Sequence, residues 1–188
     1  MHQEAIAIMA NPLETKRKII EAAALVVKEK GAANLTLDAV AEQAGVSKGG
    51  LLYHYPNKSA LLAAMVEHLN DSFERAIEEK MAKARTSWLE AYVAMSFDSQ
   101  HSQVAESAGM LAAVANDLSL LEPLSERYKA WQQQVEASGI EPNLATIVRL
   151  AADGLWFTEL FDISPLDDER RSQVLATLLS LVKKQTND

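Results

Sequence analysis

The stretch that decides the fold runs from residue 36 to residue 51 and reads TLDAVAEQAGVSKGGL. Thr36 is a good N-cap, and residues 37–44 carry apolar side chains at the spacing of one face of a short amphipathic helix. Gly45 permits the left-handed backbone conformation that residues with a side chain resist, and Ser47 can cap a second helix. The stretch therefore predicts two short helices that meet at a steep angle.

This order of a small residue, a glycine turn and an apolar contact is the helix-turn-helix pattern. Ala41 is small where the two helices cross, and Val46 and Leu51 supply the apolar contacts that fix the angle. In such a pair the second helix enters the major groove of DNA. The chain continues without a gap as GGLLYHYPNKSALL over residues 49–62.

Residues 13 to about 65 resemble the TetR family of repressors in these motifs. The shared pattern is an Ala-x-x-x-Gly-Val-Ser turn, then Gly-x-Leu-Tyr with a following His or Tyr, a short loop, a lysine and a leucine-rich helix. The resemblance implies an all-α homodimer that binds a palindromic operator and releases it when a small molecule enters the C-terminal bundle. In two departures, Tyr55 replaces the usual Phe, and Gly50 stands where many members have Thr, Ser or Ala.

The expected DNA surface combines the recognition helix with the start of the helix that follows. Lys58 adds a charge to free backbone N–H groups, which suits a phosphate, and Lys48 is the expected reader of base edges. For Tyr53, packing between the head helices is the alternative. The predicted DNA-contacting residues are Thr36, Ser47, Lys48, Gly49, Tyr53, His54, Tyr55 and Lys58.

Two glycines inside this recognition helix have two possible explanations. Gly49 and Gly50 each cost about 1 kcal/mol relative to alanine in a helix. The helix either becomes firm only on the operator, with fewer side chains to read bases, or it brings its backbone close to the phosphates.

The charge of the chain is divided unevenly. The net charge is −8, but residues 13–58 hold seven Lys or Arg against five Asp or Glu. Phosphates attract cations mainly within about 8 Å at physiological salt, so the local excess matters more than the sum. This distribution is compatible with DNA binding.

The composition is that of a compact, helix-rich protein, with 48% hydrophobic residues, 7 Gly and 5 Pro. The absence of Cys excludes disulfides, thiolate zinc sites and cysteine nucleophiles, and suits the cytoplasm. Residues 1–10 lack the basic region of a secretory signal, and no stretch approaches 18 uncharged apolar residues, so we expect no membrane association.

Helical periodicity predicts an all-α fold of about nine helices. A first helix spans about Leu13 to Lys30, and a long one runs from the Asn57 cap to about Arg85, joining head to body. Later helices are expected at about 86–100, 102–116, 119–138, 142–161 and 165–186, the last starting at Ser164-Pro165. We expect a flexible arm over residues 1–12, a three-helix DNA-binding domain over 13–58, and a ligand-binding and dimerisation bundle over 59–188.

The last two helices carry apolar side chains beyond what a single core covers. The helix over 142–161 is apolar nearly all round, so it lies centrally or meets a second subunit. Together with the last helix it is expected to form half of a four-helix dimer interface. The predicted interface residues are Ile147, Ala151, Leu155, Val174, Leu175, Leu178 and Val182.

Aromatic and methionine side chains gather in the middle helices, as they do in an apolar ligand pocket or in an ordinary core. Asp153 interrupts an apolar helix and needs either Arg149 as its partner or a cationic ligand. The predicted ligand-contacting residues are Trp88, Tyr92, Met95, Met110, Val114, Tyr128, Trp131, Asp153 and Phe157.

No enzyme, metal or cofactor is expected. Asp98 and His101 stand three residues apart, but no third ligand accompanies them, and no phosphate loop or nucleophile motif is present. The function predicted is a ligand-released repressor, whose effector is a small apolar or amphipathic molecule. The rivals are an activator or co-repressor-dependent regulator on the same fold, an all-helical enzyme, and a DNA-organising protein with no effector.

Overall fold

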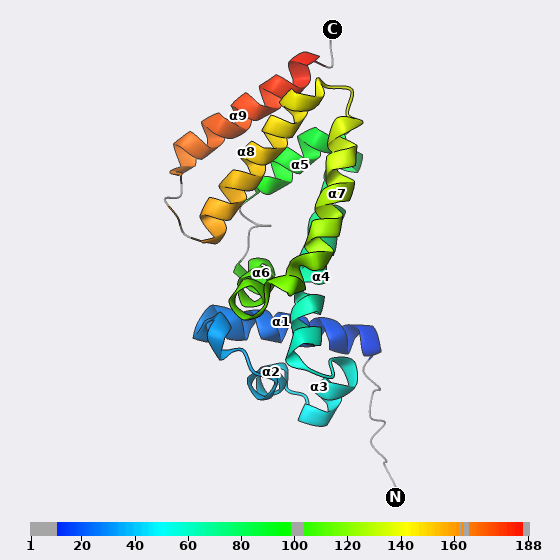
Figure 1. The fold of residues 1–188 in the computed structure, drawn as a ribbon, viewed down its shortest axis with the longest axis vertical. Helices are drawn as coiled ribbons and strands as arrows, with labels where there is room; N and C mark the ends of the chain where they lie inside the picture. The colour runs from blue at the N-terminus through cyan, green and yellow to red at the C-terminus, as the bar shows by residue number, and fades with distance from the viewer. Residues whose placement is uncertain (1–10, 99–103, 162, 164–165, 186–188) are drawn as a thin grey trace, which may run out of the picture.

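A computed structural model describes residues 11–98, 104–161, 163 and 166–185 of the 188-residue chain. Within these ranges the regular structure is entirely helical, with nine α-helices and two short 3-10 helices (Figure 1). The predicted fold class is therefore confirmed. Residues 1–10 of the expected arm lie outside the described residues. So does His101, which was considered above as a metal ligand together with Asp98.

The head is built from three helices at one end of the elongated molecule (Figure 1). Its turn is the one predicted, since Gly45 adopts φ 63° and the Thr36 and Ser47 side chains accept hydrogen bonds from the backbone N–H groups of Ala39 and Gly50. The elements of the head are α1 (Pro12–Lys30), a 3-10 turn (Ala32–Asn34), α2 (Leu37–Ala44) and α3 (Lys48–His54).

Helix α4 (Lys58–Ala84) leaves the head and runs into the body as one continuous rod. It begins at the predicted cap, where the Asn57 side chain accepts a hydrogen bond from the N–H of Ala60, and ends at Arg85 in the left-handed conformation. At about 1.5 Å per residue, its 27 residues span about 40 Å. The rod is therefore long enough to belong to both parts of the molecule.

In the body, α5 and α7 pack against the distal part of α4, α8 and α9 form a further layer on them, and α6 lies between body and head (Figure 1). The α5 helix starts with a capping box, in which Ser87 and Glu90 satisfy each other's backbone N–H groups. The elements of the body are α5 (Trp88–Ser96), α6 (Val104–Asn116), a 3-10 helix (Leu118–Leu121), α7 (Glu122–Glu136), α8 (Pro142–Leu160) and α9 (Asp168–Gln185).

The predicted start of the last helix is wrong. Helix α9 begins at Asp168 rather than at Pro165, and Asp167 caps it by accepting a hydrogen bond of 2.7 Å from the N–H of Arg170. An aspartate satisfies a free N–H group at a helix start as well as a serine does.

Among the described residues, no helix combines the length and the apolar character needed to cross a lipid bilayer.

Helix α6 crosses α4 at very short range, and Gly109 makes the crossing possible. A Cβ atom at Gly109 would lie 2.8 Å from Met65 Cβ and 2.9 Å from the Met65 carbonyl carbon. Contacts this short against backbone cannot be relieved by rotating a side chain. Beyond the crossing, Ala112 of α6 is buried in the hydrophobic core of the head, so α6 and α4 together connect the head to the body.

We expect Gly109→Ala to destabilise the chain by about 1 to 3 kcal/mol, because the added methyl group forces α6 away from α4. Urea denaturation measures the change in free energy of unfolding. The matched control is Gly49→Ala on α3, where a Cβ meets nothing within 4 Å and removal of a helical glycine is neutral or stabilising. Equal stability of the two variants would contradict the close approach.

Candidate functional site

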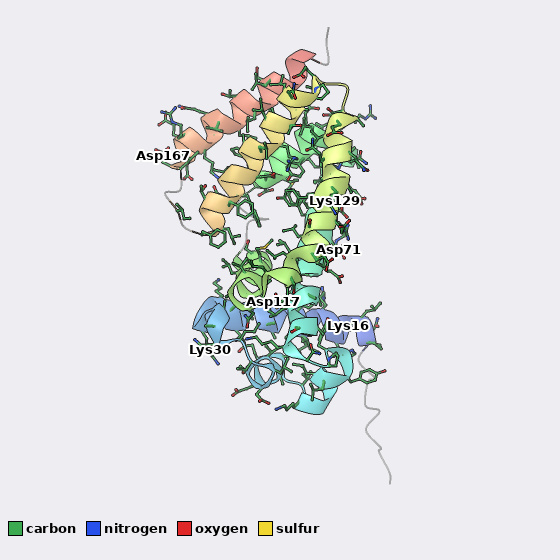
Figure 2. All side chains as sticks on the ribbon, in the orientation of Figure 1. Lys16, Lys30, Asp71, Asp117, Lys129 and Asp167 are labelled. Atoms are coloured by element: carbon green, nitrogen blue, oxygen red, sulfur yellow. The ribbon has the colours of Figure 1, made fainter. Side chains whose placement is uncertain are left out.

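The recognition helix α3 presents its polar residues at the end of the molecule away from the body (Figure 2). Tyr53 is 83% exposed, so the alternative that it packs between the head helices is not what the structure shows. Its ring meets the half-buried His54 edge to face, with 5.1 Å between centroids. Lys58 is half-buried in the first turn of α4.

Two of the predicted contact residues already serve as helix caps. The hydroxyl oxygens of Thr36 and Ser47 accept backbone hydrogen bonds, which leaves each hydroxyl proton available for donation to a phosphate. Gly50 has a local reason to be glycine, because a Cβ there would lie 3.2 Å from the capping Ser47 hydroxyl. Gly49 is exposed with open space around it.

Tyr55 does not belong to this surface. Only 6% of it is exposed, and it packs in the core of the head, one turn beyond Leu51. Burial raises the pKa of its hydroxyl above the usual value. The prediction of a DNA contact at Tyr55 is therefore corrected to a packing role.

Lys48, the expected reader of base edges, forms an ion pair with Asp38 of α2, with 2.9 Å between Nζ and the carboxylate. Both side chains are more than half exposed, and such a pair contributes about 0 to 1 kcal/mol. The pair therefore presents only a small barrier to Lys48 reaching another partner.

One face of α8 remains exposed and apolar. Ile147 is 60% exposed and Leu150 is 54% exposed. Further along the same face lie Ala151, Gly154, Phe157 and Phe161, all exposed. This stripe lies on the side of α8 that turns away from the body core.

Three of the predicted interface residues lie on the opposite side. Leu155, Leu178 and Val182 are buried in the core of the body, and Val174 and Leu175 are half-buried against it. Helix α9 covers α8 and α5 with its apolar side, so only Ile147 and Ala151 of the predicted set are exposed. The interface prediction placed these three residues on the wrong face.

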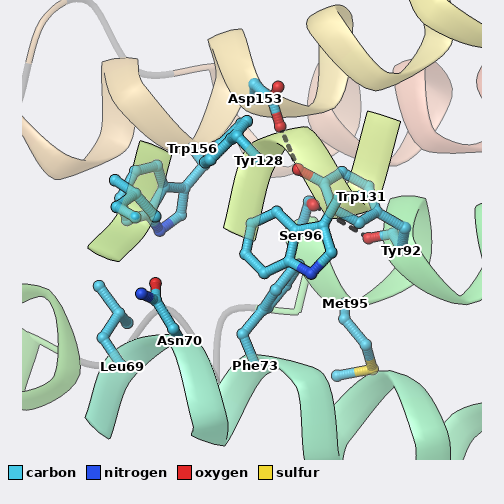
Figure 3. A pocket seen from close by; sticks show the side chains of 11 residues that line it. Leu69, Asn70, Phe73, Tyr92, Met95, Ser96, Tyr128, Trp131, Asp153 and Trp156 are labelled. Atoms are coloured by element: carbon cyan, nitrogen blue, oxygen red, sulfur yellow. Dashed lines mark hydrogen bonds between the residues drawn. The ribbon is translucent and has the colours of Figure 1, made fainter. Parts of the chain in front are cut away.

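The body contains a cavity between α4, α5, α7 and α8 (Figure 3). The volume of this cavity is only about 50 Å³. The cavity is therefore a narrow slot between side chains. Its lining consists of Leu69, Asn70, Phe73, Tyr92, Met95, Ser96, Leu124, Tyr128, Trp131, Asp153 and Trp156.

Aromatic rings form most of the walls of this slot. Tyr92 meets both Phe73 and Trp131 edge to face, with centroid distances of 5.3 Å and 5.8 Å. Tyr128 lies 5.0 Å from Trp131. Such a cluster offers flat, polarisable surfaces to a ligand.

The polar wall of the cavity centres on Asp153, which is 7% exposed. One carboxylate oxygen accepts a hydrogen bond from the Tyr92 hydroxyl, and the other accepts one from Arg149 at 2.6 Å. Arg149 is held in turn by Gln132, whose Oε1 lies 3.0 Å from its Nε. The expected Arg149–Asp153 pair is confirmed.

Burial has the largest effect on the pKa of the Asp153 carboxyl. Burial raises the pKa of Asp153 above the ordinary value, although the hydrogen bond from Tyr92 and the positive charge of Arg149 act in the opposite direction. Burial likewise raises the pKa of Tyr128 to about 12, and that of Tyr92 well above its usual value. Both phenols therefore remain hydrogen-bond donors at neutral pH.

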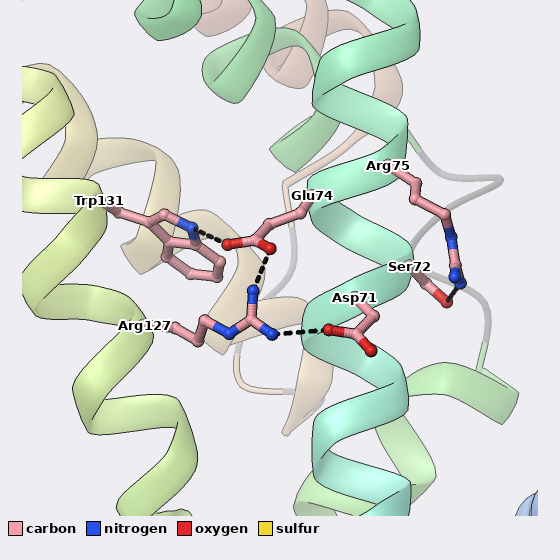
Figure 4. A network of polar contacts seen from close by, with 6 residues as sticks. All are labelled: Asp71, Ser72, Glu74, Arg75, Arg127 and Trp131. Carbon is pink, nitrogen blue, oxygen red and sulfur yellow. Dashed lines mark hydrogen bonds and ion pairs between the residues drawn. The ribbon is translucent and has the colours of Figure 1, made fainter.

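A second polar network ties the cavity wall to the rod (Figure 4). Arg127 of α7 forms ion pairs with Asp71, at 2.7 Å, and with Glu74, both on α4. The indole N–H of Trp131 donates to the other oxygen of Glu74 at 3.0 Å. One carboxylate on α4 is thus held by a side chain that lines the cavity.

Five of the nine predicted ligand residues line the cavity, and four do not. Trp88 stacks on the far side of Tyr92, 5.0 Å away, and Met110 is buried where α6 packs on the head and α4. Val114 and Phe157 are partly exposed outside the cavity. The predicted residues in the lining are Tyr92, Met95, Tyr128, Trp131 and Asp153.

The sequence reasoning missed Asn70, a buried polar residue in the floor of the cavity. A signal for it exists. Asn70 follows Val66 by four residues and precedes Phe73 by three, so it falls on the buried face of α4.

Two family models match the chain, one over each part of the fold. Residues 19–65 match the bacterial regulatory proteins of the tetR family, and residues 86–183, more than half of the chain, match the tetracyclin repressor-like C-terminal domain. The chain belongs to the TetR family. The prediction of a transcriptional regulator with a helix-turn-helix, and not an enzyme, is thereby confirmed.

Characterised TetR relatives are similar mainly in the head. The regulator TtgR of Pseudomonas putida is 38% identical over 61 residues, which are 32% of this chain and 29% of TtgR. BetI of Serratia proteamaculans is 29% identical over 74% of both chains. The chain thus spans less than a third of the length of the first relative.

Solved TetR structures share the whole fold. The multidrug binding protein EbrR, complexed with imidazole, is 25% identical with a TM-score of 0.61, over 88% of this chain and 94% of EbrR. A transcriptional regulator from Pseudomonas aeruginosa PAO1 is 21% identical with a TM-score of 0.70, over 97% of this chain and 95% of that one. The likeness to the second structure concerns the fold alone.

We expect Arg149→Met to destabilise this TetR-family protein by about 3 kcal/mol at neutral pH, because the buried Asp153 carboxylate loses its counter-charge. The control is Lys129→Met, whose partner Glu126 is exposed and whose loss costs less than about 1 kcal/mol. Urea denaturation compares the two variants with the parent chain.

The loss of folding stability in Arg149→Met is expected to be larger at about pH 7 than at about pH 5. The raised pKa of Asp153 means that the folded state binds more protons than the unfolded state, so stability falls as pH rises from the ordinary pKa through the raised one. Loss of Arg149 raises that pKa further and widens the interval. A deficit that is the same at about pH 5 and about pH 7 would contradict the assignment.

Proposed function

We propose that the chain is a ligand-responsive transcriptional repressor that acts in the bacterial cytoplasm as a homodimer on a palindromic operator. The observation that carries this proposal is the course of α4. The same rigid helix starts at the recognition helix and forms the floor of the aromatic cavity through Asn70 and Phe73.

The head supplies the operator contacts. Tyr53, Lys48 and Lys58 lie on or directly after α3, together with the hydroxyls of Thr36 and Ser47. Phosphate contacts of this kind fix the register of the head, and Lys48 exchanges its exposed partner Asp38 for a base edge.

The exposed stripe on α8 supplies the dimer contact. Monomeric proteins rarely expose a large contiguous apolar patch. If a two-fold axis passes through this stripe, the stripe of each copy is covered by the stripe of the other. Ile147, Leu150 and Phe157 form the centre of the interface in this proposal. Leu181 of α9 is also exposed, at 36%.

The cavity supplies the control of DNA binding. Two heads that read successive major-groove faces must lie about 34 Å apart, so a small shift of α4 in each subunit abolishes joint binding. A ligand that enters the slot separates its walls, and Trp131 and Glu74 transmit that displacement to α4. Ligand and operator then oppose each other.

The relatives support a small apolar or amphipathic effector. EbrR is described as a multidrug binding protein, and SmeT, 21% identical with a TM-score of 0.66, is known as a complex with triclosan. The cavity of this chain occupies the same fold and has the aromatic lining that such molecules require.

We expect Tyr53→Ala to weaken operator affinity about tenfold, because an exposed recognition-helix side chain loses its contact with the duplex. Gel shift or fluorescence anisotropy with promoter fragments from the neighbourhood of the gene gives the dissociation constant. Lys129→Ala, in the middle of α7 and away from the head (Figure 2), is the control for loss of an exposed side chain outside the head and leaves affinity unchanged.

The same titration with and without a releasing compound decides the sign of regulation. Affinity that falls when the compound is added supports a ligand-released repressor, and affinity that rises identifies a co-repressor-dependent regulator. Unchanged binding by Tyr53→Ala would remove α3 from the proposed interface.

We expect Ile147→Glu to convert the dimer into monomers, because the charge must be buried at the centre of the α8 interface. Sedimentation velocity measures the change, and operator affinity falls with it. Leu118→Glu is the matched control, since Leu118 is 67% exposed and lies outside the stripe, so this variant remains dimeric. A dimer that survives Ile147→Glu would disprove this interface.

A further inference from the structure

Asn70 is the one residue of the cavity lining whose buried polar atom lacks a partner among the described residues. It is 2% exposed, and its amide Nδ2 makes no hydrogen bond. Figure 3 shows its amide directed from α4 toward α8, on the side where Trp156 lies. A buried donor without a partner is costly, and such groups in native proteins require an explanation.

Among the described residues, the opposite wall contains no fully buried polar side-chain atom without a partner. The Asp153 carboxylate is bonded by Tyr92 and Arg149, and its negative charge is matched by the guanidinium 2.6 Å away. The Ser96 hydroxyl donates to the Tyr92 carbonyl at 2.9 Å. Among the fully buried polar side-chain atoms in the lining, the Asn70 amide nitrogen is therefore the one left without a partner, and so the one that a ligand would satisfy.

The charges around the slot disfavour ionic ligands of either sign. Its lining contains no Lys, Arg or His, so an anion would be buried without a counter-charge. A cation would find Asp153 already paired. The Arg149 guanidinium also lies 5.6 Å from the centroid of the Tyr128 ring, which takes up the attraction of that ring for positive charge.

The shape of the slot selects flat molecules. Its free space is narrow, and rings of Phe73, Tyr128 and Trp131 border it. A planar aromatic ligand enters between such rings with the smallest displacement of the walls and gains stacking contacts.

We propose that the cavity binds neutral, planar aromatic molecules that present a hydrogen-bond acceptor, such as a carbonyl oxygen, to the Asn70 amide, and that it discriminates against organic cations and anions. This inference rests on the proposed function of the cavity as an effector site. Because Asn70 is on α4, the bond also ties the ligand to the helix that positions the head.

Four bicyclic aromatic probes of similar size separate these properties. 2-Acetylnaphthalene is neutral with an acceptor, 2-ethylnaphthalene is neutral without one, N-methylquinolinium is a cation, and 2-naphthoate is an anion. Quenching of Trp131 and Trp156, which line the cavity, and titration calorimetry report binding to the purified full chain. We expect 2-acetylnaphthalene to bind about tenfold more tightly than 2-ethylnaphthalene, and both ions to bind more weakly than either.

Variants at Asn70 test the origin of this preference. Asn70→Leu keeps the volume and removes the donor, so it abolishes the difference between the two neutral probes and raises the melting temperature of the unliganded chain by a few degrees. Asn70→Asp keeps the shape and replaces the donor by a carboxylate, so it reverses the ranking in favour of N-methylquinolinium. The control Asn116→Leu, on α6 outside the lining, leaves the ranking unchanged.

The outcomes distinguish this inference from the proposed function. Tightest binding of N-methylquinolinium or 2-naphthoate to the parent chain, or a preference for 2-acetylnaphthalene that survives in both Asn70 variants, overturns the inference and leaves an effector cavity in place. Failure of all four probes to bind overturns it as well. Failure of the operator titration with a fully folded dimer would instead overturn the proposed function.

Discussion

Helix α4 is shared by two hydrophobic cores, and the rest of the structure depends on this constraint. Leu61, Leu62 and Met65 are buried in the head, whereas Ala76 and Ile77 are buried in the body. A continuous α-helix satisfies its backbone hydrogen bonds internally and bends little without a proline or a local defect, and α4 contains no proline. Displacement of either end is therefore transmitted to the other end rather than absorbed between them.

Two lateral contacts determine how α4 is held, and they differ in physical kind. At Gly109 the contact with α6 is backbone against side-chain and backbone atoms, which leaves no room for adjustment. At Arg127 the contact with α7 consists of partly exposed ion pairs, which tolerate small displacements at low cost. In the proposed mechanism, the crossing at Gly109 is therefore the fixed pivot near the head, and the cavity side of α4 is the side that moves.

Local signals in the sequence predicted the head well, because capping and turn chemistry involve residues only a few positions apart. Thr36, Gly45, Ser47 and Asn57 take the roles that their side chains dictate. Tyr55 was misplaced because a tyrosine suits both a core and a phosphate contact. For α8, which is apolar on nearly all sides, periodicity cannot tell which stripe faces the body, so the exposed face needed the three-dimensional packing of α9 and α5.

The sequence also could not show which of the apolar residues in the body line the cavity. Aromatic residues in the middle helices predicted its walls, yet Met110, on the same kind of apolar helix, packs where α6 meets the head and α4. The cavity differs from the ordinary core around Met110 in containing a buried polar atom without a partner, the Asn70 amide nitrogen. Three buried side chains among the described residues have such an atom, Asn70, Thr86 and Ser138, and of these only Asn70 lines the aromatic slot. We infer that the stability cost of an unpaired asparagine at that position is offset by a ligand that pairs with it.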